Sequence, residues 1–339
     1  MGRAIGEEEE GMISLGTDVS KAKLDCLLLD GSTGKQRDKT VPNTAAGVRT
    51  LLKWLVDRGV ILEELVVVME PTGVYHELAA QALHDAGVRV HLVNPARARN
   101  FALSLGQRGK TDAADCRSLA QMGLQQQLPR WTPPPPSARM LKALMARRAA
   151  LAEDLQRERN RLEKAQVSVV PLAVSSSIEQ GIAFIEQQLG TLGREIDEHI
   201  DGDGDLKRKR ELLLSIDGVG PRVADEITSI LGCMRFDSAE QLACYLGLTP
   251  ERWESGTSVR GRARISKAGP ARLRALLYMP AVVAKKHNRH VRELYERLLA
   301  RGKPKMLAIT AAMRKLVHLC FGVVAQNRPY DRNFGLTAS

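Results

Sequence analysis

Four carboxylates in the first third of the chain have the residue types and spacing of a metal-dependent phosphoryl-transfer site. Asp18 lies in ISLGTDVSKAKLDCLLLD, Glu70 ends LVVVME, and Asp112 and Asp115 lie in GKTDAADCRSLA. Acids gathered in one place repel one another unless a cation neutralises them. Hard oxygen ligands select Mg²⁺ or Mn²⁺, so Mg²⁺ is the predicted cofactor and Mn²⁺ an alternative. Two ions about 4 Å apart activate the attacking oxygen and stabilise the leaving one.

Each of these acids also has an ordinary structural explanation. Asp112 and Asp115 are three residues apart on a predicted helix and share one face, but the helix dipole favours acids in any first turn. Glu70 ends a predicted buried strand and can equally cap the following turn. The order of an Asp, a Glu and an Asp-x-x-Asp along a strand, a strand and a helix is what favours the metal site.

A serine in a loop rich in Arg and Gly is the second feature that suggests chemistry. Ser255 lies in ERWESGTSVRGRARISKAG, and five cations surround it: Arg252, Arg260, Arg262, Arg264 and Lys267. Guanidinium groups neutralise the charge that develops on an attacked phosphate, so Ser255 is a candidate nucleophile towards DNA. The alternative is a loop that only grips phosphate through hydrogen bonds. Tyr245 and Tyr278 are rival nucleophiles, but both lie in apolar helical stretches and are expected to be core residues.

The elements that must position the acids alternate between strand and helix over residues 12–130. Residues 13–20 and 23–30 are predicted to be adjacent strands, residues 65–70 a doubly buried strand, and residues 88–95 a strand that ends at proline. Helices are predicted over residues 45–59, 76–87 and 111–124. This order predicts an α/β domain with a central sheet.

Residues 131–205 are predicted to hold a proline linker and a coiled-coil-like helical hairpin. TPPPPS at 132–137 excludes helix, and helical spacing of apolar residues resumes over residues 138–166 and again from about Ser177 to Ile200. Such a hairpin can pair with another subunit or pack only on its own chain, and both alternatives remain open. DGDGD at 201–205 lacks the later glutamate of a calcium loop and is predicted to be a turn.

Residues 206–330 are predicted to form a mostly helical domain that binds nucleic acid. Gly218 and Gly220 lie in a turn between two helices, the pattern of a helix-hairpin-helix whose backbone N–H groups hold a phosphate. The alternative is an ordinary tight helix–helix turn, which can also use Gly-x-Gly. Residues 206–339 carry 25 Lys and Arg against 11 Asp and Glu, whereas residues 1–130 carry 16 of each. This excess is typical of a polyanion-binding surface, although a merely soluble basic surface is the alternative. Residues 331–339 are expected to be a disordered tail.

Cysteine usage and hydropathy exclude several classes of protein. The five cysteines are scattered without a CxxC pair, which suggests neither a disulfide framework nor a zinc site and favours a reducing cytoplasm. No apolar run reaches the roughly 18 residues that a membrane span needs, and the acidic start is unlike a signal peptide, so neither a membrane nor secretion is expected.

Long motifs along most of the chain resemble the DEDD transposases of bacterial insertion sequences, the family numbered one hundred and ten. The motifs include GTDVSKAKLD, MEPTGVY, HLVNPARAR, GKTDAADCR, GVGPRVA, YLGLTPERWESGTSVRGRARISKAG and LYMPAVVA, within residues 13–330. The resemblance implies a ribonuclease H-like, RuvC-like domain carrying the four acids and a helical domain whose serine, Ser255 here, becomes covalently joined to DNA. It further implies target and donor DNA as substrates, a guide (bridge) RNA, and dimers that assemble into tetramers. The acidic leader, Glu7 to Glu10, and the proline run depart from the family pattern.

The function expected from the sequence is Mg²⁺-dependent, serine-mediated DNA recombination by a cytoplasmic, nucleoid-associated transposase. Two alternatives remain. One is a junction-resolving nuclease in which metal-activated water attacks and Ser255 only binds phosphate. The other is a non-catalytic protein that binds RNA or DNA.

Overall fold

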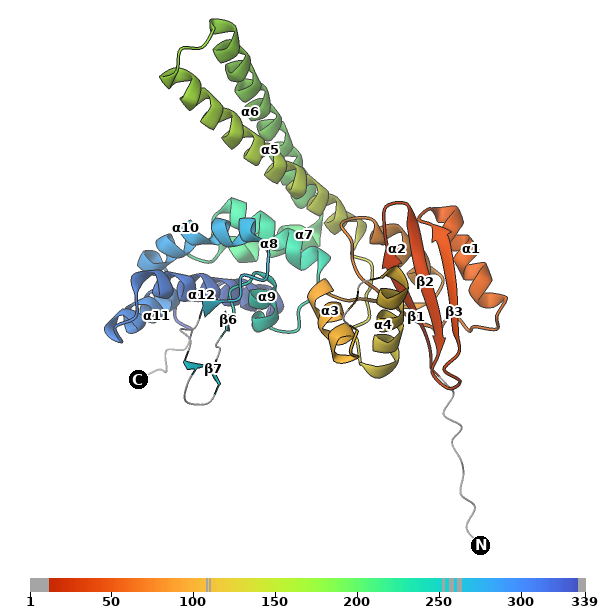
Figure 1. Ribbon diagram of the computed structural model, residues 1–339. Helices are drawn as coiled ribbons and strands as arrows, with labels where there is room; N and C mark the ends of the chain where they lie inside the picture. Colours follow the sequence, from red (N-terminus) through yellow and green to blue (C-terminus); the bar gives the residue numbers. More distant parts are fainter. Residues whose placement is uncertain are drawn as a thin grey trace. The chain divides into compact units, whose positions relative to one another are not determined.

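A mixed-sheet α/β domain followed by a mostly helical region makes up the computed structural model (Figure 1). The structure describes residues 12–107, 109, 111–251, 254–255, 259–260 and 264–334. These residues divide into two units at Pro133 and Pro134, inside the proline run. The prediction of an α/β domain followed by a mostly helical region is confirmed.

The first unit is built on a five-stranded sheet. Its strands are β1 (Ile13–Val19), β2 (Lys23–Asp30), β3 (Gln36–Pro42), β4 (Val66–Met69) and β5 (Arg89–Leu92), in the order β3-β2-β1-β4-β5. β1 pairs antiparallel with β2, and β2 with β3, whereas β1, β4 and β5 run parallel. β1 and β4 are therefore neighbouring parallel strands whose carboxyl ends lie at one edge.

The edge strand β3 is not among the strands predicted from the sequence. Its residues QRDKTVP are mostly exposed, with Val41 buried, so it lacks the apolar alternation that marks a half-buried strand. Charged side chains on an edge strand discourage pairing with other chains. Helix α3 (Pro95–Ser104) was also missed, although Asn94 caps it and Pro95 occupies its first position.

Helices cover both faces of the sheet. Buried residues of α1 (Ala45–Val56) and α2 (His76–Asp85) form one core with Leu15, Val67 and Val90. On the other face, α3 and α4 (Asp112–Gln125) pack against Val66 and Val68, and α4 also packs against Leu27 and Leu29. The α4 face is the one that matters for the acids, because α4 begins at Asp112.

Close approach of α4 to β1 depends on a glycine in each element. A Cβ atom at Gly16 would lie 1.9 Å from the carbonyl oxygen of Cys116, and one at Gly123 would lie 2.3 Å from Ser14 Oγ. Backbone can therefore lie against backbone along this contact, which holds the start of α4 beside the end of β1.

The second unit begins with two long helices, α5 (Pro136–Val167) and α6 (Leu172–Asp201), which pack side by side (Figure 1). Pro136, the last proline of the run, opens α5 at a position where its missing N–H costs nothing. A carboxylate that is 3% exposed, Asp225, anchors the base of this pair. It forms ion pairs with Arg148 of α5 (3.0 Å) and with Arg210 (2.9 Å).

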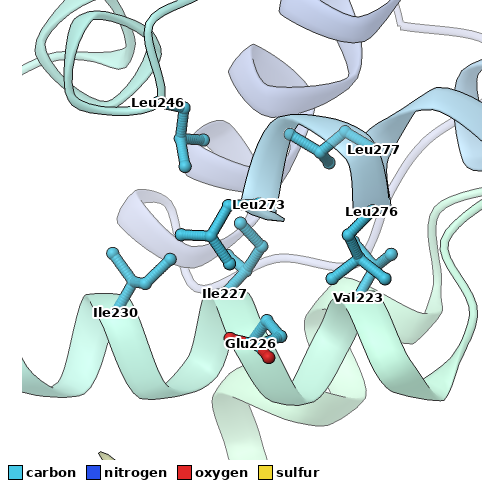
Figure 2. Close-up of a pocket in the computed structure, with 8 residues that line it drawn as sticks. All are labelled: Val223, Glu226, Ile227, Ile230, Leu246, Leu273, Leu276 and Leu277. Atoms are coloured by element: carbon cyan, nitrogen blue, oxygen red, sulfur yellow. The ribbon is translucent and has the colours of Figure 1, made fainter. Parts of the chain in front are cut away.

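Within the described residues, the core of the second unit is formed by six further helices: α7 (Gly204–Leu214), α8 (Pro221–Cys233), α9 (Ala239–Tyr245), α10 (Ala271–His287), α11 (Arg289–Ala300) and α12 (Lys305–Ala325). Figure 2 shows α8 and α10 meeting through Ile227, Leu273 and neighbouring aliphatic side chains. The gap that these side chains line has a volume of about 10 Å³. This gap holds one water at most and is no ligand site. The turn predicted at 201–205 joins α6 to α7, and its Asp203 caps α7 by accepting from the backbone N–H of Asp205 and Leu206.

Among the helices that the structure describes, α12 is long and apolar enough to cross a membrane by length and composition. Arg314 and Lys315 interrupt its apolar sequence. Its buried residues, among them Leu316, Val317 and Cys320, belong to the same core as those of α8 and α10. This packing is that of a core helix.

Residues Asp331–Phe334 dock on the helical core, so the prediction of a disordered tail from residue 331 is wrong for these four residues. Arg332 forms a bidentate ion pair with Asp217, at 2.8 and 2.5 Å, and the carbonyl oxygen of Phe334 lies 2.9 Å from His290 Nε2. No local pattern in the sequence marks this docking, because all of its partners lie far away in the chain. Residues 335–339 lie outside the described range.

Candidate active site

Strand alternation brings two carboxylates to the α4 face of the sheet. Ser14 and Gly16 contact α4, so Asp18, two residues further along β1, lies on the same face. Leu27 and Leu29 of β2 pack on α4, which puts Asp25 on that face as well. The antiparallel register places Asp18 directly opposite Asp25.

Three carboxylates converge at this position. One oxygen from each of Asp18, Asp25 and Asp112 lies within 4.8 Å of the other two. Thr111 caps α4 by accepting from the backbone N–H of Ala114, which starts the helix at Asp112. Lys23 contributes the opposite charge, with its Nζ 2.7 Å from Asp25 and 3.4 Å from Asp112.

Asp115 and Glu70 lie at the edge of this group rather than inside it. Asp115 accepts a hydrogen bond from Gln107 Nε2 at 3.2 Å and is close enough to Asp18 to raise its pKa. Glu70 directly follows β4, and the pairing of Thr17 with Met69 puts it one step further at the level of Asp18. Asp18, Asp112 and Asp115 are therefore close together, and the backbone of Glu70 follows β4 at the same edge of the sheet.

The charge of the cluster is felt most at Asp18. Partial burial raises the pKa of its carboxyl above the ordinary 3.8, and repulsion from Asp112, Asp115 and Asp25 raises it further. A hydrogen bond with the backbone at Val19 opposes the shift. A cation among these oxygens would reverse the balance, because it favours the ionised form.

Asp25 is a candidate ligand that sequence analysis missed. The position of Asp25 can be predicted from the β1–β2 hairpin. If residues 20–23 form the turn, antiparallel register pairs residue 18 with residue 25. Apolar alternation identifies KLDCLLLD as a strand, but only its register against the preceding strand brings Asp25 to Asp18.

The donor set fits a divalent cation of the hard class. Carboxylate oxygens are the ligands that Mg²⁺ and Mn²⁺ prefer, and neither cysteine beside the cluster is suited to bind as a thiolate. Burial raises the pKa of the Cys26 and Cys116 thiols to about 12, and the Cys116 Sγ–H donates to the backbone oxygen of Asp25 at 3.1 Å.

Ser255 belongs to an arm of short antiparallel ladders rather than to the loop that was predicted. β6 (Pro250–Glu251) pairs with β9 (Arg264–Ile265), and β7 (Glu254–Ser255) pairs with β8 (Val259–Arg260). Two-residue strands carry no periodic signal in a sequence, which explains the difference. The backbone register puts Ser255 opposite Val259.

The predicted phosphate-binding cations are only partly within the described residues. Arg264 and Lys267 are exposed, and Lys267 has a left-handed backbone with φ of 55°. Arg252 and Arg262, and the side chains of Ser255 and Arg260, lie outside the described residues.

The two rival tyrosines differ from each other in burial. Tyr245 packs against Phe236, and burial raises its pKa. Tyr278 is 38% exposed, so its prediction as a core residue is wrong. Its stretch of α10 buries Leu277 and Ala281 and turns position 278 outwards, which helical spacing explains.

The predicted turn at Gly218 and Gly220 lies between α7 and α8. Gly218 has φ of 100°, and a Cβ there would lie 2.7 Å from Ala284 Cβ, so packing alone requires glycine at this position. Gly220 caps α8, and a Cβ there would meet open space. A phosphate contact at either residue remains a prediction.

A mixed sheet with carboxylates converging beside its parallel strands is the arrangement of a metal-dependent phosphoryl-transfer enzyme. A family model described as a DEDD transposase matches residues 15–171, and a second, described as Transposase IS116/IS110/IS902 family, matches residues 210–296. The chain belongs to this family of DEDD transposases.

Two curated relatives align with nearly the full length of the chain, and a third aligns with about a third of it. The chain is 30% identical over 321 residues to a pilin gene-inverting protein of Moraxella lacunata, covering 94% of this chain and 97% of that protein, and equally to its counterpart in Moraxella bovis. It is 29% identical over 121 residues to an uncharacterised 43.6 kDa protein of insertion element IS110 from Streptomyces coelicolor, covering 35% and 30% of the two chains.

Among solved structures, a chain of Thermus thermophilus RuvC in complex with a Holliday junction substrate matches 32% of this chain and 90% of its own length. The identity is 15% and the TM-score 0.25, which is too low to carry an argument. The family assignment rests on the sequence matches.

Proposed function

We propose that this transposase cuts and rejoins DNA through a covalent phosphoserine intermediate. Asp18, Glu70, Asp112 and Asp115 would hold Mg²⁺, with Asp25 as a further ligand, and Ser255 would be the nucleophile. The observation that carries the proposal is the convergence of Asp18, Asp25 and Asp112, each of which has a carboxylate oxygen within 4.8 Å of the other two. When bound, the metal would stabilise negative charge on the reacting phosphate.

The covalent step replaces one phosphate ester by another. The Ser255 Oγ–P bond forms, the bond from phosphorus to one deoxyribose oxygen breaks, and the serine proton passes to a nearby base while the leaving sugar oxygen is protonated. Rejoining runs the same exchange backwards with a different strand end, so no energy source is needed. Arg264 and Lys267, which are exposed on the same arm, would neutralise the phosphate.

DNA inversion is a second outcome that this chemistry allows. The pilin gene-inverting proteins of Moraxella align with nearly the entire chain, and inversion and insertion differ in which ends are rejoined rather than in the bond chemistry. We infer that the chain carries out strand exchange, and that this exchange can lead either to inversion or to insertion of DNA.

Guidance by a structured RNA and assembly into tetramers complete the proposal. Both rest on the resemblance of the motifs to the family. The end of the α5–α6 pair is consistent with assembly, since several of its apolar side chains are exposed: Val167, Val169, Leu172 and Val174.

The decisive experiment looks for a denaturant-resistant protein–DNA adduct. Purified protein would be incubated with its element's flanking RNA, a labelled target duplex and Mg²⁺, and compared with Ser255→Ala and Asp112→Asn. We expect the adduct in the wild type, its loss in Ser255→Ala, and its loss in EDTA or in Asp112→Asn. Ser266→Ala is the matched control, because it removes a hydroxyl from the base of the same arm.

Two results would replace the proposal. Cleavage that needs Mg²⁺ but leaves no adduct, and is unchanged in Ser255→Ala, would make the protein a hydrolytic nuclease with Ser255 as a phosphate contact. Full biological activity in both Asp112→Asn and Ser255→Ala would make it a non-catalytic nucleic-acid-binding protein.

A further inference from the structure

A basic groove lies in the second unit, at the corner between α10 and α11. It encloses about 580 Å³, and its lining includes Asp217, Gly218, His287, Arg289, Arg292 and Arg332. Three of these residues are arginines and one is a carboxylate. In the sequence, KKHNRHVR at 285–292 concentrates cations here, and none of its residues was among the predicted nucleic-acid contacts.

The walls of the groove are held in place by a buried asparagine. Asn288, which is 0% exposed, caps α11 by accepting from the backbone N–H of Val291 and donates to the backbone oxygen of Asp217 at 3.3 Å. The Tyr330 hydroxyl donates to the same Asn288 Oδ1 at 3.0 Å. The α10–α11 corner, the α7–α8 turn and the C-terminal segment are thereby fixed to one another.

The packing of Gly218 against Ala284 brings the same two corners together. Glycine here leaves the main chain of the turn in the wall of the groove, within reach of a ligand. The packing of Gly218 and the hydrogen bonds of Asn288 therefore fix the backbone of the elements that carry the lining side chains.

The cations of the groove are not all consumed by internal ion pairs. Arg332 is paired with Asp217, and Arg289 with Glu293 at 2.7 Å. Arg292 makes no ion pair with any residue that the structure describes, and it is exposed. An exposed guanidinium held beside two others favours an anion with several oxygen atoms.

We propose that this groove binds the sugar–phosphate backbone of duplex DNA, at a site separate from the carboxylate cluster. A backbone presents phosphates at regular spacing to several cations, and backbone N–H groups and guanidinium groups are its usual partners. The choice of DNA rests on the proposed function, since a transposase must hold the duplex whose strands it exchanges. Arg292 and Arg289 provide the charge, and Asn288 positions the helix that carries them.

Binding measured without metal tests the groove independently of catalysis. Fluorescence anisotropy of a labelled duplex of arbitrary sequence would be recorded with the full-length protein in EDTA over a series of KCl concentrations. The test variant is Arg289→Gln with Arg292→Gln. The matched control is Arg297→Gln with Arg301→Gln, which removes the same charge from exposed positions at the other end of α11.

A plot of log K against log salt has a negative slope. In the groove variant this slope is expected to become less negative by about 0.9 for each phosphate that the protein no longer neutralises. At 0.1 M salt, that slope corresponds to about an eightfold decrease of affinity per phosphate. The control pair should keep the wild-type slope. Arg292→Lys should also keep it, because a lysine still neutralises one phosphate, and this variant guards against misfolding as the cause.

An unchanged slope in the groove variant, or an equal decrease in the control, would overturn the proposal. A decrease of affinity for an RNA hairpin of similar length, with duplex DNA unaffected, would also overturn it and assign the groove to RNA. Since EDTA suppresses metal-dependent chemistry throughout, failure of the phosphoserine mechanism would leave this result intact.

Discussion

At the level of single residues, the position of Asp18 suits metal binding but disfavours its ionised carboxylate in the metal-free fold. Its carboxylate is partly buried beside Asp25 and Asp112, and Asp115 adds to the repulsion. Lys23 offsets part of that charge through Asp25 and Asp112. The site is therefore unfavourable for an ionised Asp18 until a cation binds, which is a common property of metal-binding acids.

This conflict predicts that Asp18→Asn stabilises the metal-free protein at pH 7. The folded-state pKa of Asp18 is raised above 3.8, so the folded state binds more protons than the unfolded state between the two values. Stability accordingly falls as pH rises through that window, and the penalty persists above it. Thermal unfolding in EDTA should show a higher midpoint for Asp18→Asn than for wild type at pH 7, and a smaller difference at pH 4.

Added Mg²⁺ supplies the control for that prediction. A ligand at one hundred times its Kd stabilises the folded state by about 2.7 kcal/mol, so Mg²⁺ should raise the wild-type midpoint more than that of Asp18→Asn. A lower midpoint for Asp18→Asn in EDTA would mean that the Asp18 carboxylate stabilises the fold, contrary to the charge argument.

At the level of elements, the site depends on how closely α4 lies against β1. Gly16 permits the contact, and the start of α4 carries Asp112 to the oxygen atoms of Asp18 and Asp25. Any side chain at position 16 would push the helix away and would separate acids that belong to different elements.

Gly16→Ala is expected to destabilise the first unit by about 1–3 kcal/mol or more, the usual cost of overpacking, because its Cβ would lie 1.9 Å from the Cys116 oxygen. Urea unfolding followed by tryptophan fluorescence measures this, since Trp54 and Trp131 both belong to that unit. Gly190→Ala is the control: its Cβ would meet open space in the middle of α6, and helix propensity favours alanine by about 0.5–1 kcal/mol. Equal stability of Gly16→Ala and wild type would show that α4 can shift without cost.

For the whole molecule, charge is divided between the two ends of the chain. Residues 206–339 hold an excess of 14 positive charges, whereas residues 1–130 are balanced. The carboxylate cluster belongs to the balanced part, and the Ser255 arm and the α10–α11 groove to the basic part. The candidate metal ligands are thus carried by a different unit from the cations that we propose bind a polyanion.

This division predicts where duplex DNA contacts the full-length protein. Affinity should fall steeply and linearly with the logarithm of salt concentration, because each neutralised phosphate releases counterions. Photo-crosslinking to DNA in EDTA, followed by peptide mapping, should give most crosslinks within residues 206–339. A flat salt response, or crosslinks mainly within residues 12–130, would count against the basic part as the principal binding surface.

The sequence alone determined most elements of the first unit, the four acids and the basic part of the chain. These features are local: a continuous apolar run marks the buried strand at residues 65–70, the helical period marks α4, and charge can be counted directly. Strand β3 escaped because an exposed, charged edge has no apolar period.

The tertiary structure alone decided which of these residues meet. Asp25 joins Asp18 through cross-strand register, Asp112 joins both because two glycines let α4 lie against β1, and Arg292 lines one groove with Gly218 because buried Asn288 holds its walls. Each of these arrangements joins residues from separate elements, so its geometry depends on packing across long sequence separations that no local pattern records.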